Sequence, residues 1–394
     1  MGRGIVSVFQ STLPYGQSGN EDGHEFFEFR NSFVMHSKSI FPPLVATVLF
    51  GYQISYAQKI LETYPVIETP PVASQGDAAD DPAFWLNIVD SSKSVIFGTD
   101  KEAGIYAYNL AGEQIQFVGV GRINNIDVRA GYLLDDIEVS ILVGTNRDLN
   151  SIDFFSISNK GELVEYSGNR VVTDLVTIYG LCLFKDTEND KTYIFVSDEE
   201  SLTIRQYLIE SIFPARLSMV REIRTSSVSE GCVVDDSRGY LYFSQEDENN
   251  GVYKVLARPV ESEVQTVDVS KRYGGHLEGD SEGLAIVPSE KKGLLIVSSQ
   301  GSDDFIVFER DGSNRYLGRF LIAGHEAVGG SYIDGASDTD GIEVFLGDLP
   351  GSFAGGIFIA QDGLNESRLG GEENQNFKLV SLKPILEHFQ SVNP

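Results

Sequence analysis

The sequence is poor in the residues that build most metal and nucleophile sites. Its 394 residues include five histidines, with no HExxH pair, and two cysteines. Zinc sites draw on His and Cys at short, fixed spacings, so none is expected. Cys182 and Cys232 stand far apart along the chain. A disulfide between them is one alternative, but we expect two buried free thiols, because cysteine is among the most buried residue types.

Basic residues are scarce as well. The chain has 30 Lys and Arg against 58 Asp and Glu, which gives a formal net charge of −28. A surface of this charge repels phosphate backbones and anionic lipids, so neither nucleic acid nor a membrane is expected as a partner. It also repels a polyanionic substrate unless cations intervene. The alternative is that the acidity serves only solubility.

Long apolar runs are limited to one segment near the N-terminus. Residues 35–57 contain a positive start, an apolar stretch over residues 40–52, and a small-x-small site that ends at Ala57. This layout predicts a secretory signal peptide, and the stretch is too short for a membrane anchor. We expect residues 1–34 to be an upstream extension or a mis-assigned start, and the mature chain to be secreted or periplasmic. The alternative is a genuine N-terminal extension with a fortuitous apolar run.

Long helical periodicity is missing too, except near residues 384–389. From residue 58 on, short runs rich in Ile, Val, Phe and Tyr alternate with turns of Gly, Asp, Asn and Ser, as in SVIFGTD, TYIFVSD and GLLIVSSQ. Such runs and turns are typical of β-strands. The chain is therefore predicted to be all-β.

Two signals recur in step along these strands. The first is a polar residue at the head of an apolar strand, and it stands at Asp81, Asn125, Tyr179, Glu230, Glu282 and Asp340. The second is a polar residue that closes the next strand, and it stands at Asp100, Asn146, Asp198, Glu246, Gln300 and Asp362. Six such units, each with room for four strands, predict a six-bladed β-propeller as a single domain over residues 58–394. One period across the whole chain argues against a β-sandwich.

The last unit shows only three strands, and we expect a strand near residues 64–66 to supply its fourth and close the ring. In a closed ring, equivalent positions of successive blades meet at one end. The acidic side chains predicted to gather there are Asp80, Asp81, Glu230, Glu246, Asp280, Glu282, Asp334 and Asp340. Carboxylates this close raise one another's pKa unless a cation intervenes, and Ca²⁺ accepts six to eight oxygen ligands. The alternative is an acidic rim of solvated turn residues.

Basic and hydroxyl groups accompany these acids. Lys101 and Arg147 follow the second signal in the first two units, and Tyr179 heads the third. This combination suits an anionic ligand bridged by metal, with Arg holding phosphate oxygens. The alternative is that each is an ordinary surface residue. No GxSxG or GxxxxGK[ST] motif is present.

At these residues the chain resembles the β-propeller phytases, the calcium-dependent alkaline phytase family. The strings that carry the resemblance follow one another through nearly the whole predicted mature chain. They include DAADDPAFW, NNIDVR, TNRD, YGLCLF, SEGCVVDD, DSEGLAI, DGASDTDGIEV, IAQDGLN and NQNFKLV. The resemblance implies a six-bladed propeller and a phosphoric monoester hydrolase of the 3-phytase type. Its substrate would be phytate or a calcium–phytate complex, and we expect a monomer.

The resemblance also implies several calcium ions, some structural and some catalytic. The implied ligands of the catalytic ions are Asp80, Glu230, Glu246, Asp280, Glu282 and Asp340. Asp81, with the backbone carbonyls of Pro82 and Ile126, would hold a structural ion, and Asp334 another. Lys101, Arg147 and Tyr179 would contact phosphate, Gln300 would line the site, and Glu230 would take part in catalysis.

Two positions depart from the family pattern. The family often has lysines where this chain has Glu102 and, in the third blade, the acidic string VSDEES around Glu199. Fewer cations imply weaker substrate binding or a greater reliance on calcium. Two alternatives to a phytase therefore stay open: an exported, calcium-stabilised propeller that binds a phosphoester without turnover, and a calcium-dependent lactonase-type hydrolase. The latter would need little cationic surface, against which Lys101 and Arg147 argue.

Overall fold

The computed structural model describes residues 60–134, 137–247, 251–327 and 330–391. The chain divides into one unit over Met1–Tyr56 and a second over Ala57–Pro394, and all described residues belong to the second. The predicted signal peptide and upstream extension lie outside the described residues. No helix in the described part of the chain is long and apolar enough to cross a membrane.

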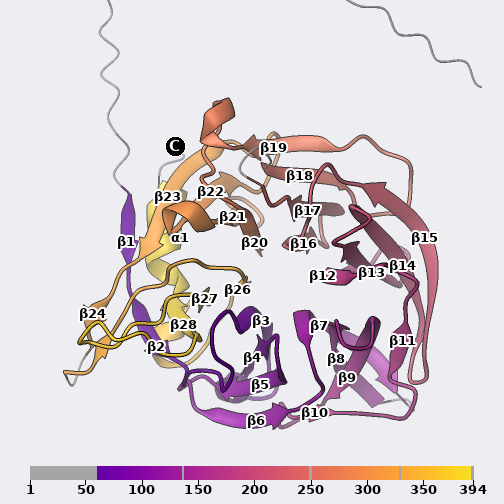
Figure 1. Ribbon diagram of the computed structural model, residues 1–394, viewed down its shortest axis with the longest axis horizontal. Coiled ribbons are helices and arrows are strands. Elements are labelled where there is room, and N and C mark those ends of the chain that lie inside the picture. The colour runs from indigo at the N-terminus through magenta and orange to yellow at the C-terminus, as the bar shows by residue number, and fades with distance from the viewer. Residues whose placement is uncertain (1–59, 135–136, 248–250, 328–329, 392–394) are drawn as a thin grey trace, which may run out of the picture. The chain divides into compact units, whose positions relative to one another are not determined.

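Six small antiparallel sheets are arranged around a common axis, in the order of the chain (Figure 1). This confirms the predicted all-β, six-bladed propeller. The first blade comprises β3 (Ala79–Trp85), β4 (Val95–Asp100), β5 (Gly104–Asn109) and β6 (Gln114–Val118). The second comprises β7 (Ile123–Leu134), β8 (Ile137–Asn146), β9 (Ser151–Ile157), β10 (Leu163–Val164) and β11 (Arg170–Val172). The third comprises β12 (Ile178–Asp186), β13 (Lys191–Asp198), β14 (Thr203–Ile212) and β15 (Ala215–Arg224).

The remaining blades follow the same plan. The fourth comprises β16 (Cys232–Asp235), β17 (Tyr240–Ser244), β18 (Gly251–Leu256) and β19 (Gln265–Val269). The fifth comprises β20 (Ser281–Val287), β21 (Leu294–Ser299), β22 (Asp304–Glu309) and β23 (Tyr316–Ile322). The sixth comprises β26 (Ile342–Phe345), β27 (Ile357–Asp362) and β28 (Asn376–Ser381). A short ribbon of β24 (His325–Glu326) and β25 (Tyr332–Ile333) lies in the connection between the fifth and sixth blades.

The start of the described chain closes the ring. The strand β2 (Pro65–Glu68) pairs antiparallel with β28 and supplies the fourth strand of the sixth blade, as predicted. Just before it, β1 (Leu61–Thr63) pairs in parallel with β23 of the fifth blade. In Figure 1 these two indigo strands lie beside the orange and yellow end of the chain. Pairing the two ends of the chain in this way covers the sheet edges that an open ring would expose.

The hydrophobic core is divided into six clusters, one between each pair of neighbouring blades. The middle strands therefore face apolar neighbours on both sides. The strand β4 is buried along its whole length, and so are β9, β21 and β27. This explains their nearly continuous runs of Val, Ile and Phe, since a strand buried on both faces has no reason to alternate polar and apolar residues.

Four of the six inner strands share one irregularity near their starts. The pairing register shifts between Ala79 and Pro82 in β3, and likewise at the starts of β7, β12 and β20. A bulge of this kind redirects side chains out of the regular pleat. It covers four of the strand heads that the sequence identified, namely Asp81, Asn125, Tyr179 and Glu282. The other two, Glu230 and Asp340, stand just before β16 and β26.

Glycines behind these heads let neighbouring blades approach closely. At Gly180 a Cβ atom would overlap the carbonyl oxygen of Glu230 in the next blade, and at Gly341 it would overlap that of Asp80. Only glycine fits such contacts between backbones. The glycines therefore determine how near the heads of adjacent blades stand to one another.

Cys182 and Cys232 form a disulfide, with their Cα atoms 5.8 Å apart. The expectation of two free thiols is therefore wrong. The two residues are 50 positions apart, which is about one repeat, so they occupy equivalent places on the inner strands of adjacent blades. The bond joins β12 to β16. Along the chain, Cys182 follows Tyr179 by three residues and Cys232 follows Glu230 by two.

The only α-helix in the described chain is α1 (Leu382–Ser391), which covers the region where helical periodicity was noted. Its apolar residues Leu382, Ile385 and Phe389 are buried in the cluster between the fifth and sixth blades. Four short 3₁₀ turns complete the secondary structure: η1 (Ser91–Lys93), η2 (Lys271–Tyr273), η3 (Gln300–Ser302) and η4 (Gly351–Phe353).

Removing the disulfide should destabilise the propeller without changing its fold. The bond closes a loop of 50 residues, and links of this kind contribute about 2–4 kcal/mol by restricting the unfolded chain. We expect a Cys182→Ser/Cys232→Ser variant to lose about that much free energy of unfolding in denaturant titrations. A reducing agent should lower the stability of the unmodified protein and leave the variant unaffected. Equal stability of the two proteins under oxidising conditions would contradict this expectation.

Candidate functional site

The inner strands of all six blades line one cavity, which has a volume of about 270 Å³. The acidic groups at its wall are Asp80, Asp81, Asp127, Glu230, Asp235, Asp236, Asp340 and Glu343. Asp80 and Glu230 are only 1% and 8% exposed. The alternative of a solvated acidic rim is therefore wrong for these two carboxylates, which are buried.

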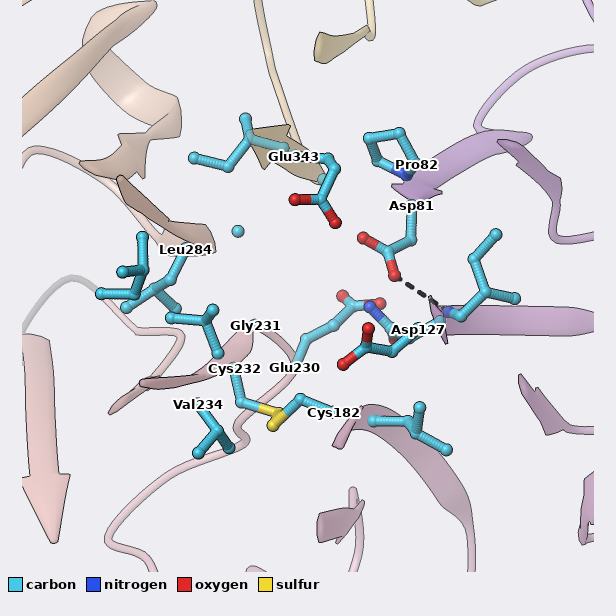
Figure 2. Close-up of a pocket in the computed structure, with 18 of the residues that line it drawn as sticks. Asp81, Pro82, Asp127, Cys182, Glu230, Gly231, Cys232, Val234, Leu284 and Glu343 are labelled. Atoms are coloured by element: carbon cyan, nitrogen blue, oxygen red, sulfur yellow. Dashed lines mark hydrogen bonds between the residues drawn. A yellow bond between two sulfur atoms is a disulfide. The ribbon is translucent and has the colours of Figure 1, made fainter. Parts of the chain in front are cut away.

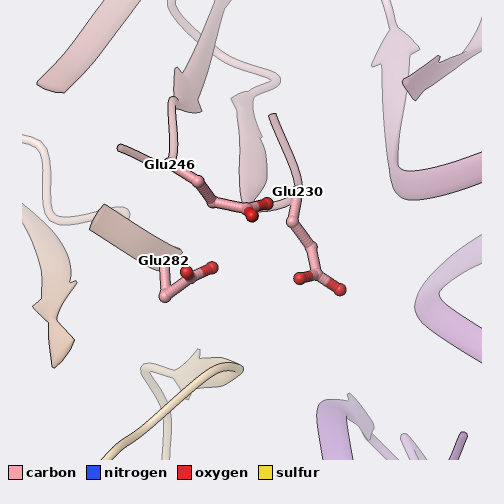
Figure 3. Close-up of side chains that lie close together, drawn as sticks. All are labelled: Glu230, Glu246 and Glu282. Atoms are coloured by element: carbon pink, nitrogen blue, oxygen red, sulfur yellow. The ribbon is translucent and has the colours of Figure 1, made fainter. Parts of the chain in front are cut away.

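Three glutamates form the densest group. Glu230, Glu246 and Glu282 each offer one carboxylate oxygen within 4.8 Å of the others. Figure 3 shows the three side chains converging from the fourth and fifth blades. Glu282 is 5% exposed, and one of its oxygens has no hydrogen-bond partner. The same is true of one oxygen of Asp80, so the site holds buried acceptors that the protein itself does not satisfy.

These carboxyl groups are strongly perturbed. Burial raises the pKa of Asp80 and of Glu282, and the neighbouring Glu230 raises both further. Burial together with Glu230 and Asp280 raises the pKa of Glu246 to about 8. Burial also raises the pKa of Asp340 to about 7, although Lys101 opposes the shift. Without a cation, the group holds protons that ordinary carboxylates lose near pH 4.

Lys101 stands on one side of this acidic group. Its Nζ lies 3.4 Å from Asp340 and 2.8 Å from the exposed carboxylate of Asp77. Burial lowers the pKa of Lys101, but the carboxylates of Asp80 and Asp340 outweigh burial and raise it above its ordinary value. Lys101 is therefore a permanent cation, with a side chain only 15% exposed.

Arg147 and Tyr179 stand together on another side. The guanidinium lies over the Tyr179 ring at 5.1 Å, and it forms an ion pair of 2.9 Å with Glu199. Burial, Glu230 and Glu246 raise the pKa of Tyr179, so its phenol stays protonated and can donate to those carboxylates. Asn124 connects this side to the acids, because its amide donates to Glu230 while its oxygen accepts from Arg147 at 3.2 Å. The side chains of Lys101 and Arg147 are both largely enclosed, so neither is an ordinary surface residue.

Gln300 and Asp280 complete the predicted ring. The amide of Gln300 donates to Asp340 at 2.8 Å, and Gln300 begins the short turn η3 after β21. Asp280 precedes β20, and its carboxylate accepts the backbone N–H of Asp247 at 2.7 Å. The structure thus places both beside the carboxylates with which the sequence grouped them.

A second acidic group lies within the cavity (Figure 2). Asp81 accepts the backbone N–H of Ile126 at 2.9 Å, next to Pro82 on β3. Figure 2 shows the carboxylates of Asp127 and Glu343 turned towards the same space. Burial and the nearby Asp127 raise the pKa of Glu343 to about 8. Asp81 therefore belongs to this group rather than to the glutamate cluster.

Asp334 does not lie in the ring, contrary to the sequence-based grouping. It follows β25 and pairs with Lys378, which also contacts Glu68 at 2.7 Å and Asp362 at 3.1 Å. Its other oxygen accepts the backbone N–H of Glu366 at 2.6 Å. The reason is that Asp334 belongs to the connection before the sixth blade, whereas the head of that blade is Asp340.

Several residues of the site were missed by the sequence analysis. Asn124 bridges Glu230 and Arg147, Asp77 pairs with Lys101, and Asp127 and Glu343 face the second acidic group. A signal for the last two exists, because Asp127 follows the strand head Asn125 by two residues and Glu343 follows the strand head Asp340 by three. Nothing comparable marks Asp77, since acidic loop residues are common throughout this chain.

The donors present suit a hard divalent cation. All are oxygen atoms of carboxylates, amides or carbonyls, and they come from several blades in an irregular arrangement, which Ca²⁺ tolerates better than Mg²⁺ does. The unpartnered oxygens of Asp80 and Glu282 are buried acceptors that a cation would satisfy. The residues present therefore fit a cation site at the glutamate cluster.

Comparison with known proteins was informative at the level of sequence. Residues 36–393 match the phytase family. A 3-phytase from Bacillus subtilis (strain 168) is 37% identical over 330 residues, which cover 82% of this chain and 84% of that protein. Among solved structures, hydrazine synthase of Kuenenia stuttgartiensis aligns with a TM-score of 0.45 at 12% identity, over 71% of this chain and 80% of that one. BBS1N in complex with ARL6DN aligns with a TM-score of 0.43 at 10% identity, over 81% and 97%. These two likenesses are too weak to bear on activity.

The raised pKa values predict how stability depends on pH when divalent cations are chelated. A carboxyl group whose pKa is higher in the folded than in the unfolded protein does not lower the free energy of unfolding below about pH 4, where it is protonated in both states. The destabilisation grows as the pH rises. It levels off above the pKa of the group in the folded protein, which is about 7 for Asp340 and about 8 for Glu246. We therefore expect the free energy of unfolding in chelator to fall between pH 5 and pH 8, approximately.

Denaturant titrations across this pH range measure the slope. A Glu282→Gln variant should show a smaller decrease, because it removes one buried acid from the cluster. A Glu188→Gln variant, whose side chain is 74% exposed on the third blade, should behave like the unmodified protein. A free energy of unfolding that rises from pH 5 to pH 8, approximately, would contradict the perturbed pKa values.

Proposed function

Because the chain belongs to the phytase family, we propose that it is a calcium-dependent phytase whose active site is the acidic ring at the axis. It releases phosphate from phytate, myo-inositol hexakisphosphate, and forms lower inositol phosphates. The phytase activity follows from the family and the curated relative. The calcium dependence and the roles of individual residues rest on the chemistry of the site.

One observation carries the proposal. Buried carboxylates with unpartnered oxygens share the site with two enclosed cations. Lys101 interacts with Asp80 and Asp340, and Arg147 is linked to Glu230 through the side chain of Asn124. A site that binds a phosphate and divalent cations together needs both kinds of group, because the anion must be held from two sides.

The acids divide into groups with different roles. Asp80, Glu230, Glu246, Asp280, Glu282 and Asp340 would hold the catalytic calcium ions. Asp81, with the carbonyls of Pro82 and Ile126, would hold a structural ion inside the cavity. Asp334, which is grouped with Glu68 and Asp362 around Lys378, would hold another ion outside the ring.

Calcium, when bound, would lower the pKa of a water molecule and offset the charge of the transferred phosphoryl group. Lys101 and Arg147 hold the non-bridging oxygens of the phosphate and offset the charge that builds up as water attacks phosphorus. Tyr179 supplies a protonated hydroxyl beside Glu230 and stacks under Arg147, which keeps the guanidinium aimed at the site. Gln300 holds Asp340 in place through its amide.

Two other functions remain as alternatives. A propeller that binds a phosphoester without turnover would use the same cations and acids. A lactonase-type hydrolase would use the metal without Lys101 or Arg147, and the enclosure of both cations at the acidic ring speaks against it. Export rests on the signal-peptide pattern of residues 35–57 and fits millimolar calcium outside the cell.

The first test is phosphate release from phytate by residues 58–394 near pH 7, with about 1 mM calcium and again after chelation. We expect release only with calcium. A Glu230→Gln variant should lose more than about 100-fold in turnover, because even outer partners of metal ligands often cost 10–100-fold. Glu188→Gln serves as the control and should retain full activity.

Three outcomes would contradict the proposal. Release that persists after thorough chelation would remove the calcium dependence. A folded protein that binds phytate but releases no phosphate would favour the binding module. Hydrolysis of a lactone without any phosphate release would favour the lactonase.

The acid side of the activity profile should depend on calcium concentration. Protons and calcium compete for the same carboxylates, so cation binding must displace the protons that the raised pKa values retain. We expect the pH of half-maximal activity to fall as calcium rises, by about one unit per tenfold increase if each ion displaces one proton. An acid limb that does not move with calcium, or full activity near pH 3, would be incompatible with carboxylate ligands.

A further inference from the structure

The Arg147 guanidinium already has an anionic partner inside the proposed site. One terminal nitrogen lies 2.9 Å from a Glu199 carboxylate oxygen, and the other donates to the Asn124 side chain at 3.2 Å. The Tyr179 ring lies against one face of the guanidinium. The proposed catalytic scheme uses Arg147 and Tyr179 but gives Glu199 no role.

Glu199 is held where it can reach Arg147. It follows directly after β13, and its backbone N–H donates to the carbonyl of Thr177 at 3.0 Å. The preceding Asp198 is buried, and its carboxylate accepts the backbone N–H groups of Val176 and Thr177 in the loop before β12. Glu199 therefore projects from a fixed backbone in the third blade, while Arg147 comes from the second.

Glu199 also lies near the acidic ring. It contributes to the raised pKa of Glu246, together with Glu230 and Asp280. Its side chain is 38% exposed, against 22% for that of Arg147, so Glu199 is the more open to solvent of the two and does not line the cavity.

A phosphate and Glu199 compete for the same donors. A guanidinium grips a carboxylate or a phosphate through N–H groups in one plane, and here one edge is taken by Glu199. A phosphate on that edge must displace the carboxylate, which then remains close by as a like charge. The displacement raises the free energy of the enzyme–substrate complex relative to the free enzyme.

We propose that Glu199 is an internal competitor of the substrate for Arg147 and thereby sets the affinity of the site for phosphorylated ligands. The inference rests on the proposed function, since it concerns the same site. The ion pair is broken on binding and stays broken in the transition state. Glu199 therefore raises KM and leaves kcat unchanged, as expected for an interaction that affects bound substrate and transition state equally.

The test compares two neighbouring single-charge variants. Glu199→Gln removes the ion pair with Arg147, and we expect KM for phytate to fall about two- to fivefold with kcat unchanged, since partly exposed ion pairs are of modest strength. Glu200→Gln makes the same change of charge one residue further on. Glu200 is exposed and bonds to the Thr177 hydroxyl at 3.0 Å rather than to Arg147, so its KM should not change.

Three kinetic outcomes would overturn the inference. An unchanged or higher KM in Glu199→Gln would show that Glu199 does not compete with substrate. An equal decrease in both variants would show a general effect of surface charge. A change confined to kcat would place Glu199 in the chemical step. Thermal unfolding checks that both variants keep their fold, which is expected because both side chains lie at the surface.

A binding measurement separates this inference from the proposed function. Calorimetric titration with inorganic phosphate needs no turnover, and Glu199→Gln should bind it more tightly by the same factor, whereas Glu200→Gln should not. If the protein releases no phosphate from phytate but shows this difference, the proposed function fails and the competition stands. If it hydrolyses phytate and Glu199→Gln binds phosphate no more tightly, the competition fails and the phytase stands.

Discussion

The close approach of neighbouring blades at their inner strands is the constraint on which the rest of this structure depends. Gly180 and Gly341 bring the backbone of one strand head against the carbonyl of the next, and the pairing register shifts at four of the six heads. Because the heads are mostly acids, packing that stabilises the propeller also forces like charges together. The apolar clusters between the blades oppose that repulsion and hold the carboxylates in place.

The acid ring must then be neutralised in one of two ways. Burial and mutual repulsion raise the pKa of Asp80, Glu246, Glu282 and Asp340, so protons neutralise the ring when no cation is present. Calcium would replace these protons with a charge that can also hold phosphate. A net charge of −28 would otherwise repel a highly phosphorylated substrate. In the proposed site, the same electrostatic conflict would account both for a bound cation and for the ability of so acidic a protein to accept an anion.

The two cations of the site are themselves compensated. Lys101 pairs with Asp77 and Asp340, and Arg147 pairs with Glu199. Neither is an isolated charge, so in the proposed site the binding of a phosphate would exchange one anionic partner for another. Exchange of this kind lowers affinity but costs little in stability, since partly exposed pairs contribute little to either state. The disulfide adds rigidity next to this region, because it links β12, which carries Tyr179, to β16, which begins two residues after Glu230.

The sequence by itself determined the all-β class, the number of blades, the closing strand at the start of the described chain and most of the acid ring. It could do so because every blade of a propeller repeats the same order of strands. Residues at the same position in successive repeats therefore meet at the axis. Tertiary structure decided what depends on distances between blades and on side-chain direction. Cys182 and Cys232 are about one repeat apart in the sequence, but they can bond only because adjacent inner strands bring their Cα atoms to 5.8 Å. Asp334 lies outside the ring because it belongs to the connection between two blades, whose length the repeat does not fix. The contact of Glu199 with Arg147 arises where two loops of neighbouring blades meet.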